Sequence, residues 1–407
     1  MKTKALFIWL LLALVSCVDQ RSNEASLKAA DLKNTGWADI EQKAIGSSVS
    51  FAMWAGDESR NRFFKSEVAD KLKDKYGITL NIVPLGDTAE AVNKLLNEKQ
   101  AGKTSGGSID IVWINGENFR TAKQGGLLWG DFAEQLPNYV FYETGAGRID
   151  FGTPVEGLES PWLRSQFVFA YDTARMKDPP RSIEKLGEWI KANPGKFAYP
   201  APPDFTGSAF LRHILFHFGG GAQNFGKFDE QLYVEASAKT FAFLNEIKPF
   251  LWRGGESYPN SPADMNRLFA NSEIDLAMAF GPTFASEAIK RNEFPETVRT
   301  FVLDEGTIRN YSFLTIPFNA SNAAGALVVI NYFMSHEFLL RQAEVLGSNY
   351  PHDLDKLTPS ERSAADALPR NEATLDSAEL REHSVPEADS EYLERFEKDW
   401  RTKVLLK

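Results

Sequence analysis

Four short segments of the chain combine polar and aromatic side chains, the mixture that lines most small-molecule sites. They are residues 54–60, 115–119, 204–208 and 280–284. Each is expected at the end of a strand or the start of a helix, where free N–H groups and the helix dipole favour ligand binding. The pattern predicts one shared cleft. Its expected ligand-binding residues are Trp54, Gly56, Ser59, Arg60, Asn115, Glu117, Asn118, Trp162, Asp204, Thr206, Ser208, Gly281, Thr283 and Tyr311.

Most of these positions also have a purely structural alternative. A hydroxyl at the start of a helix can be only its N-cap, which applies to Ser59, Thr206, Ser208 and Thr283. An Asn after a strand can simply form the turn, and the two Trp residues can belong to the core. The cleft interpretation depends on four such loops coming together from two halves of the chain.

Motifs of several common enzyme classes are missing from the sequence. There is no G-x-S-x-G elbow of an α/β-hydrolase and no G-x-G-x-x-G after the first expected strand. Residues 221–227 nearly match a phosphate-binding loop, but Phe228 stands where Ser or Thr has to bind Mg²⁺. We therefore expect no catalytic residues and no cofactor. The alternative is an exported hydrolase that uses Asp204 or Glu117.

Two histidines, His213 and His217, stand four residues apart, a spacing that zinc ligands use. The Glu of an H-E-x-x-H motif is missing, and the residues between the two histidines are apolar. A hydrogen-bonded role in the core is favoured over a metal site. The single Cys of the chain excludes an internal disulfide and a Cys-rich metal site.

Composition and charge limit the class of partner. The 407 residues include 55 Asp and Glu against 45 Lys and Arg, which gives a formal charge of −10. The chain lacks the basic stripe that a nucleic-acid phosphate backbone requires, so no nucleic acid is expected. With 43% hydrophobic residues, it is long enough for two or three domains that each bury a core.

The N-terminus has the layout of a secretory signal. Lys2 and Lys4 precede an apolar run at residues 5–15, which is too short to span a bilayer comfortably. Residues 14–17 (LVSC) resemble the lipobox of bacterial lipoproteins, with a plain signal peptide as the alternative. We expect residues 1–16 to be a signal peptide, Cys17 to carry the lipid, and residues 17–46 to form a tether with one short helix. The protein would then be a membrane-anchored periplasmic lipoprotein.

The hydrophobic pattern of the mature chain alternates strands and helices, which is typical of a sheet with crossover helices. The expected early elements are strands at 48–55, 78–83 and 109–114, a helix at 63–76 that ends at Gly77, and a helix after a capping box of Asp87 and Glu90. The expected later elements are a turn-rich stretch at 157–162, strands at 165–171, 197–199, 274–280 and 311–316, helices at 183–190, 209–218 and 323–334, and a helical tail with a capping box at Thr358.

Five segments together resemble the extracellular solute-binding proteins of ABC importers, family 1, and within it the branch of thiamine, ferric and polyamine binders. The resemblance covers nearly the whole mature chain. The segments that carry it are residues 50–56 (SFAMWAG), 109–119 (IDIVWINGENF), 160–172 (SPWLRSQFVFAYD), 197–210 (FAYPAPPDFTGSAF) and 312–335 (SFLTIPFNASNAAGALVVINYFMS).

This resemblance implies an α/β fold of the two-lobed periplasmic-binding-protein type (type II), whose lobes are joined by crossing hinge strands and close on one solute. It places residues 47–162 and 306–346 in the first lobe and residues 163–305 and 347–407 in the second. It also implies a monomer without enzymatic activity, which delivers a small-molecule solute to an ABC permease and its ATPase subunits.

The class of solute is only partly indicated. Ferric ion is disfavoured, because the iron-binding members use a late Tyr-Tyr pair that this chain lacks. An acidic protein with aromatic loops suits a cationic or heteroaromatic solute, whereas the Thr-Gly-Ser helix start at 206–208 suits an anionic group. A thiamine-like compound would satisfy both. A lipoprotein that binds only other proteins is a further alternative.

Overall fold

The structure is a computed structural model, and it describes residues 27–407 except 33, 144, 146, 369 and 370. The predicted signal peptide and Cys17 lie outside the described residues. The described end of the predicted tether is folded into α1 (Ala29–Leu32) and α2 (Trp37–Ala44). Ile40 and Ala44, one turn apart, are buried where α2 packs against α12 (Ala323–Phe333). From residue 27 on, the expected tether with one short helix is therefore wrong.

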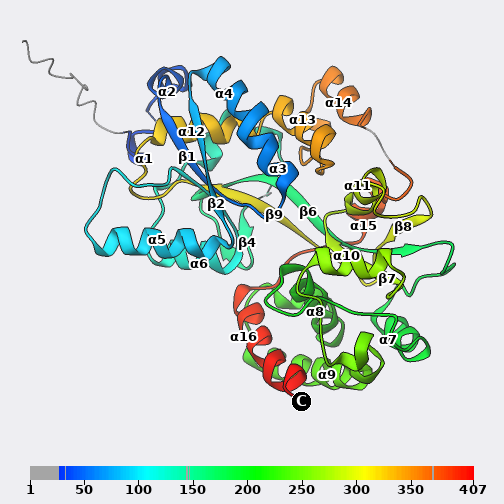
Figure 1. The fold of residues 1–407 in the computed structure, drawn as a ribbon. Helices are drawn as coiled ribbons and strands as arrows, with labels where there is room; N and C mark the ends of the chain where they lie inside the picture. Colours follow the sequence, from blue (N-terminus) through cyan, green and yellow to red (C-terminus); the bar gives the residue numbers. More distant parts are fainter. Residues whose placement is uncertain (1–26, 33, 144, 146, 369–370) are drawn as a thin grey trace, which may run out of the picture.

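The first lobe is built on three parallel strands, as the alternating pattern predicts, and β1 and β2 lie side by side in Figure 1. The order of the three strands is β2-β1-β3. Gly77 ends the helix before β2 in a left-handed conformation (φ 67°), and the capping box of Asp87 and Glu90 is confirmed. The elements are β1 (Ser48–Trp54), α3 (Glu58–Phe63), a π-helical turn (Phe64–Val68), α4 (Ala69–Tyr76), β2 (Thr79–Leu85), α5 (Thr88–Gln100), β3 (Ile111–Ile114), α6 (Gly116–Gln124) and the hairpin β4 (Ile149–Asp150) and β5 (Thr153–Pro154).

Two long antiparallel strands, β6 (Glu159–Asp172) and β9 (Thr307–Thr315), run through both lobes. β9 pairs with β3 in the first lobe, and β6 pairs with β7 (Leu276–Phe280) and β8 (Val298–Phe301) in the second. The expected turn at 157–162 is thus wrong from Glu159 on. The sheet tolerates Pro161 because the register shifts between Pro161 and Leu163.

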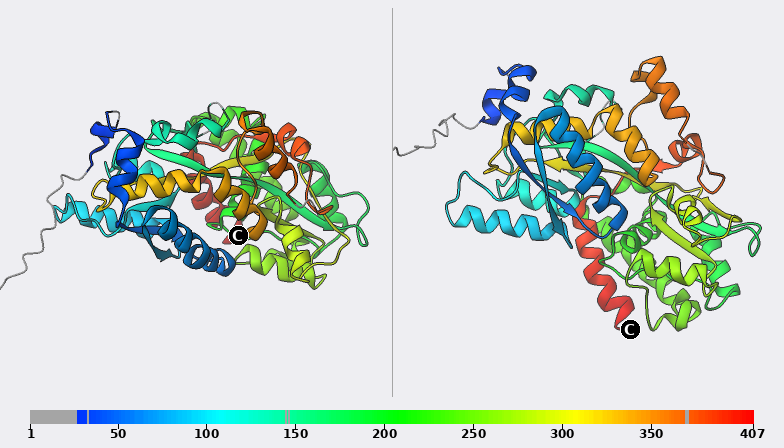
Figure 2. Two further views of the ribbon diagram at one scale, coloured as in Figure 1. Left: turned by 90° about the horizontal axis from the view of Figure 1, so that it is seen from above. Right: turned by 45° about the horizontal axis from the view of Figure 1, so that its top comes forward.

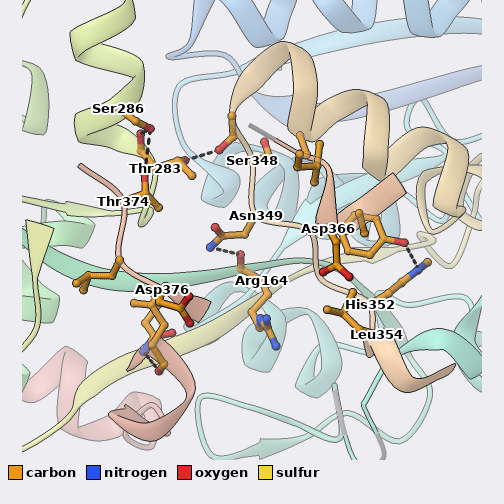
Figure 3. A pocket seen from close by; sticks show the side chains of 18 of the residues that line it. Arg164, Thr283, Ser286, Ser348, Asn349, His352, Leu354, Asp366, Thr374 and Asp376 are labelled. Atoms are coloured by element: carbon orange, nitrogen blue, oxygen red, sulfur yellow. Dashed lines mark hydrogen bonds between the residues drawn. The ribbon is translucent and has the colours of Figure 1, made fainter. Parts of the chain in front are cut away.

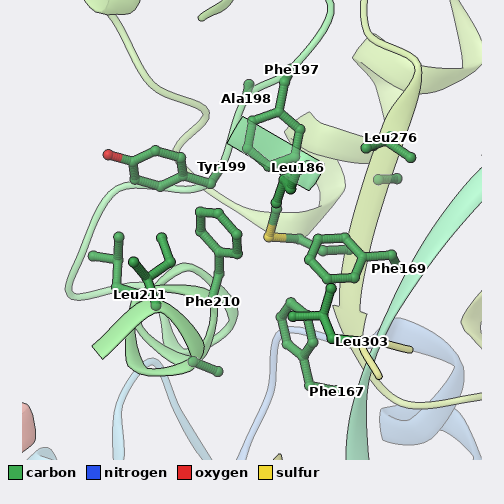
Figure 4. Packing of buried hydrophobic residues seen from close by; sticks show 14 of the residues in the cluster. Phe167, Phe169, Leu186, Phe197, Ala198, Tyr199, Phe210, Leu211, Leu276 and Leu303 are labelled. Carbon is green, nitrogen blue, oxygen red and sulfur yellow. The ribbon is translucent and has the colours of Figure 1, made fainter. Parts of the chain in front are cut away.

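The second lobe covers β6 and β7 with helices. Residues 197–199 do not form the predicted strand: their side chains are buried in the core (Figure 4), and no strand of the described chain pairs with them. Their apolar character therefore reflects burial rather than sheet formation. The helices are α7 (Ile183–Ala192), α8 (Phe205–Phe218), α9 (Glu230–Ile247), α10 (Pro262–Ala270) and α11 (Phe284–Lys290).

The chain then returns to the first lobe and ends in the second. The predicted capping box at Thr358 is confirmed. The remaining elements are α13 (His336–Leu346), α14 (Pro359–Asp366), α15 (Ser377–Glu382), β10 (Ser384–Val385, beside β9), α16 (Ser390–Trp400) and a π-helical turn (Arg401–Leu405), with 3-10 segments at Ala133–Gln135, Pro137–Phe141, Ala222–Phe225, Lys248–Phe250, Trp252–Gly255 and Leu354–Lys356.

Each lobe has its own core. In the first lobe one face of the sheet buries an aromatic cluster around Trp162, and the other face buries smaller residues around Phe119. The second lobe buries a larger cluster around Phe169 and Phe210 (Figure 4). His352 lies on the first lobe, because its Nε2 is 2.9 Å from the carbonyl oxygen of Met334. We therefore propose that the first lobe extends to about residue 357, beyond the expected end at 346.

Within the part of the chain that the structure describes, no single helix is long and apolar enough to cross a membrane. Taken together, α12 and α13 are long and apolar enough to do so, but the chain bends by 62° between them.

Replacing Trp162 by Ala is expected to lower the free energy of unfolding by about 3–5 kcal/mol. The indole is fully buried and packs edge-on against Phe51, Phe64 and Trp113. Urea unfolding followed by circular dichroism measures the loss. Trp54→Ala is the matched control, because it removes the same side chain from a position that is 45% exposed. An equal loss in both variants would contradict the core position of Trp162.

Candidate functional site

The loop after β1 is held by Asp57, which sequence analysis did not single out. Its Oδ1 accepts hydrogen bonds from the backbone N–H groups of Ser59 (2.9 Å) and Arg60 (3.1 Å), so Asp57 and not Ser59 is the N-cap of α3. The exposed side chain of Ser59 is therefore not needed to cap the helix. Gly56 lies against the indole of Trp54: a Cβ at residue 56 would come within 2.1 Å of that ring.

The side chain of Arg60 is largely buried beneath this loop. Its guanidinium lies over the ring of Trp113, 5.2 Å from the centroid, and its Nε is 3.8 Å from Oδ2 of Asp57. Burial lowers the pKa of Arg60, with Asp57 acting in the opposite direction. Among the described residues no acceptor forms a hydrogen bond with this Nε. The loop therefore holds the guanidinium of Arg60, whose Nε–H donor has no acceptor among the described residues.

The loop after β3 brings a carboxyl group to the same edge of the sheet. The side chain of Asn118 donates to Oε1 of Glu117 (3.2 Å), and Asn115 stands at the N-cap position of α6 without a side-chain capping bond. Burial raises the pKa of Glu117. The N–H of Gly116 donates to Oδ2 of Asp150 at 2.5 Å, which fixes this loop to the β4–β5 hairpin.

In the second lobe Asp204 is the N-cap of α8, since its Oδ1 accepts from the N–H of Gly207 at 2.9 Å. Thr206 and Ser208 are buried and are not caps, which corrects the structural alternative considered for them. Burial raises the pKa of Asp204. The carboxylate of Asp204 already accepts from the N–H of Gly207 at this helix start. It therefore lies where the sequence suggested that an anionic group of the ligand could bind.

A buried ion pair lies beside this helix. Arg212 of α8 is 1% exposed, and it donates from Nε to Oε2 (3.0 Å) and from Nη2 to Oε1 (3.1 Å) of Glu387. It also donates to the hydroxyl of Ser208 and lies over the rings of Phe151 and Phe205. Burial raises the pKa of Glu387, and Arg212 opposes that effect. The two partners are 175 residues apart, so no local pattern could have paired them.

Aromatic rings approach from both lobes. Phe205 of α8 is 39% exposed and lies 5.0 Å from Phe280 at the end of β7 and 6.2 Å from Phe151 of the first lobe. Trp54 is an exposed ring of the first lobe. Electrostatic interactions link Asp57 with Arg291 and Glu117 with Arg212 across the lobes. Side chains of the two lobes thus approach each other here, and we call residues 54–60, 115–118, 204–208 and 280–281 the facing loops.

Three predicted residues do not take the expected positions. Trp162 is fully buried in the first-lobe core and cannot touch a ligand, which corrects that prediction. Thr283 donates its hydroxyl to the carbonyl oxygen of Gly347 and lines a different cavity. Tyr311 lies on the hinge strand β9, where it lines a second cavity of about 350 Å³. Gly281 follows β7 directly, as predicted.

The cavity beside Thr283 has a volume of about 860 Å³ and lies between the hinge, α11, α13 and residues 347–368 and 371–381. Hydroxyl groups line one side, where Thr374 donates to Ser286 (3.1 Å) and Ser286 donates to the carbonyl oxygen of Thr283 (2.7 Å) (Figure 3). Arg164 of β6 lies on another side (Figure 3). Sequence analysis missed this cavity, because its wall is completed by the C-terminal segment.

His213 has the core role that the sequence favoured. Its Nδ1 is 2.7 Å from the carbonyl oxygen of Ala209, and its Nε2 accepts from the N–H of Ile308 at 3.0 Å. Burial lowers the pKa of His213 to about 3. Both ring nitrogens are therefore used by the backbone. No group of three or more His, Cys, Asp or Glu side chains within the described residues could hold a metal ion.

Two α/β lobes joined by two long strands define the two-lobed periplasmic-binding-protein fold of type II. Two solved structures show the same fold. The spermidine/putrescine ABC transporter substrate-binding protein PotD of Streptococcus pneumoniae has a TM-score of 0.63 at 15% identity, with 88% of this chain and 98% of that chain covered. A periplasmic thiamin binding protein has a TM-score of 0.61 at 14% identity, with 88% and 96% covered.

Sequence comparison defines the family. The model of the bacterial extracellular solute-binding proteins matches residues 67–364. Over 364 residues the chain is 36% identical to Protein YnjB of Escherichia coli (strain K12), with 88% of this chain and 94% of the relative covered. The chain belongs to the bacterial extracellular solute-binding protein family.

Replacing Arg212 by Met is expected to cost about 3–5 kcal/mol of stability, because Glu387 would stay buried without its partner. The double variant Arg212→Met/Glu387→Leu should recover most of that loss, since it removes both charges. Urea unfolding of the single and double variants tests this. Lys191→Met breaks an exposed pair with Glu246 and is the matched control, with an expected cost below about 1 kcal/mol. The losses of Arg212→Met and Glu387→Leu, measured separately, can be added and compared with the loss in the double variant. If the double variant loses as much stability as this sum, the two side chains are not coupled, which would contradict the prediction.

Proposed function

We propose that the chain is the lipid-anchored periplasmic receptor of an ABC importer and closes on one small solute held between the facing loops. The observation that carries this proposal is the pair of exposed aromatic rings, Trp54 and Phe205, on loops of opposite lobes. Exposed aromatic rings are suited to close on a flat or cationic solute from both sides. Closure of the hinge then excludes water from the bound solute.

The charges around these rings favour a cationic or heteroaromatic solute. Glu117 and Asp204 are half-buried carboxyl groups, and among the described residues no ion pair neutralises either of them. Burial raises both pKa values because it disfavours the ionised carboxylates. A bound cation would stabilise the ionised forms and so offset this effect. The names of two proteins of the same fold, for spermidine/putrescine and for thiamin, support this class.

The hydrolase alternative has less support. It requires Asp204 or Glu117 to transfer a proton, yet Asp204 is occupied as the cap of α8 and Glu117 accepts from Asn118. The family match also points to solute binding. The protein-binding alternative has no specific observation in its favour.

A thermal-shift screen of residues 18–407 against thiamine, thiamine phosphate, putrescine, spermidine, sugars and amino acids tests the solute class. A compound at 100 times its Kd should add about 2.7 kcal/mol, hence a rise in Tm of several degrees. Trp54→Ala and Phe205→Ala are each expected to weaken binding of that compound at least about tenfold, because each removes one aromatic wall.

Val234→Ala is the matched control for these variants, because it shortens an exposed apolar side chain on α9, away from the facing loops. Unchanged affinity in both Trp54→Ala and Phe205→Ala would show that the solute binds elsewhere. Consumption of the compound during the assay would favour the hydrolase.

The lipid anchor and delivery to the permease and ATPase subunits complete the proposal. Replacing Cys17 by Ser is expected to abolish incorporation of labelled palmitate and to move the protein from the detergent phase to the aqueous phase, since the acyl chains hold it at the membrane. Ser16→Ala, next to the predicted cleavage site, keeps a small residue and is the control. Incorporation of the label into Cys17→Ser would contradict lipidation at this residue.

A further inference from the structure

The cavity of about 350 Å³ lies along the part of β9 where one edge of that strand is unpaired, and we call it the edge pocket. β10 pairs with β9 at residues 307–308 and β3 pairs with it at residues 313–315. Between them, residues 309–311 line the pocket, and on this edge of β9 they pair with no strand of the described chain. The other walls are the β4–β5 hairpin and residues 384–387. Its volume is at the small end of the range of small-molecule sites.

One end of the edge pocket carries an unneutralised carboxyl group. Asp150 is only 2% exposed, and its Oδ2 accepts from the N–H of Gly116. Within the described part of the chain Asp150 has no ion-pair partner and no further hydrogen bond. Other carboxyl groups lie near it: Glu117 and Glu387 act on Asp150, and Glu159 is fully buried with both oxygens unpartnered. Burial raises the pKa of Asp150 well above its ordinary value, and Glu387 and Glu117 raise it further, so a cation placed here would favour the ionised form.

The other end carries an excess of positive charge. Arg309 of β9 donates to Oε2 of Glu143 (3.0 Å), and Arg164 of β6 donates to Oε1 of the same carboxylate (2.8 Å). Although burial opposes it, the two guanidinium groups lower the pKa of Glu143, which stays ionised. Two cations share one anion here. Arg309 and Glu143 line both this pocket and the larger cavity. A guanidinium has five N–H donors, and within the described part of the chain Arg309 uses one of them.

Aromatic side chains also line the edge pocket. Tyr311 and Phe313 of β9 and Phe151 of the hairpin line the pocket. The ring of Phe151 also contacts Phe205 and Arg212, so it separates the edge pocket from the facing loops. Asp150 and Tyr311 therefore belong to a site that differs from the one proposed between those loops.

We propose that the edge pocket binds a small zwitterion, with its ammonium group against the carboxylate of Asp150 and its carboxylate against the guanidinium of Arg309. The ammonium supplies the ion-pair partner that the Asp150 carboxyl group lacks, and the ligand carboxylate balances the second of two guanidinium groups that share Glu143. The rings of Phe151 and Tyr311 contribute cation–π contact and apolar surface. A plain amine or a plain carboxylate satisfies only one end of the pocket.

This site goes beyond the proposed function, because it does not use the facing loops. Its walls come from the first-lobe hairpin, a hinge strand and the C-terminal segment. A ligand that touches all three stabilises the arrangement of the lobes in which they meet.

Titration calorimetry with the mature chain tests the proposal. The probes are glycine, β-alanine, 4-aminobutanoate and 5-aminopentanoate, with butylamine and butanoate as the singly charged analogues. At least one zwitterion is expected to bind about tenfold or more tightly than both analogues. Equal affinity of a singly charged analogue, or no binding of any zwitterion, overturns the proposal.

Two substitutions locate the site. Asp150→Asn keeps an acceptor for the N–H of Gly116 and removes the charge, and it should weaken zwitterion binding at least about tenfold without loss of Tm. Arg309→Gln should weaken the zwitterion but leave the affinity for butylamine unchanged. Asp178→Asn removes an exposed carboxylate elsewhere and is the matched control. Zwitterion binding that survives Asp150→Asn but is lost in Trp54→Ala would place the compound at the facing loops, which overturns this inference and supports the proposed function.

Discussion

The hydrogen-bonded ladder between β6 and β9 is the constraint on which the other sites depend. Because both strands run through both lobes, they join the strands of the first lobe directly to those of the second. Arg164 lies opposite Tyr311, and Gln166 lies opposite Arg309, so residues of the two strands meet as cross-strand pairs at the hinge. The closure that we propose would bend this ladder. The walls of the edge pocket and of the larger cavity then move with it, since both cavities are lined by hinge residues.

The sequence predicted what local chemistry decides. Gly77 ends its helix because a left-handed residue favours glycine, and the capping boxes at Asp87 and Thr358 satisfy helix N–H groups from within four residues. The parallel strands also followed from the pattern. In contrast, the stretch from Glu159 looked like a turn because Pro161 is usually a breaker, and only pairing with β9 makes it a strand.

The sequence predicted which loops belong to the candidate site, but it did not predict which of their side chains contact each other. The facing loops follow from strand ends and helix starts, which are local signals. The N-cap roles of Asp57 and Asp204 were missed because hydroxyl residues two or more positions later fit the same motif. The partners Glu387 and Asp150 could not be found at all. Each lies far along the chain from Arg212 or Gly116, and only the folded lobes bring these atoms together.

The C-terminal helix α16 adds a constraint on how the lobes move. Its apolar side chains Tyr392, Phe396 and Trp400 are buried in the second-lobe core. At its start the N–H of Ser390 donates to the carbonyl oxygen of Phe151, and the helix lies between α6 of the first lobe and α8 and α9 of the second (Figure 2). Opening of the lobes therefore has to break this contact or carry the hairpin with the second lobe.

Phe151 connects this contact to both proposed sites. Its carbonyl oxygen holds α16, its ring lines the edge pocket, and the same ring touches Phe205 among the facing loops. A ligand that moves this ring from one side changes the wall that the other ligand meets. Since such coupling is reciprocal, whatever one ligand does to the affinity of the second, the second does to the first by the same factor. The hairpin is thus one physical route by which the two proposed sites would influence each other.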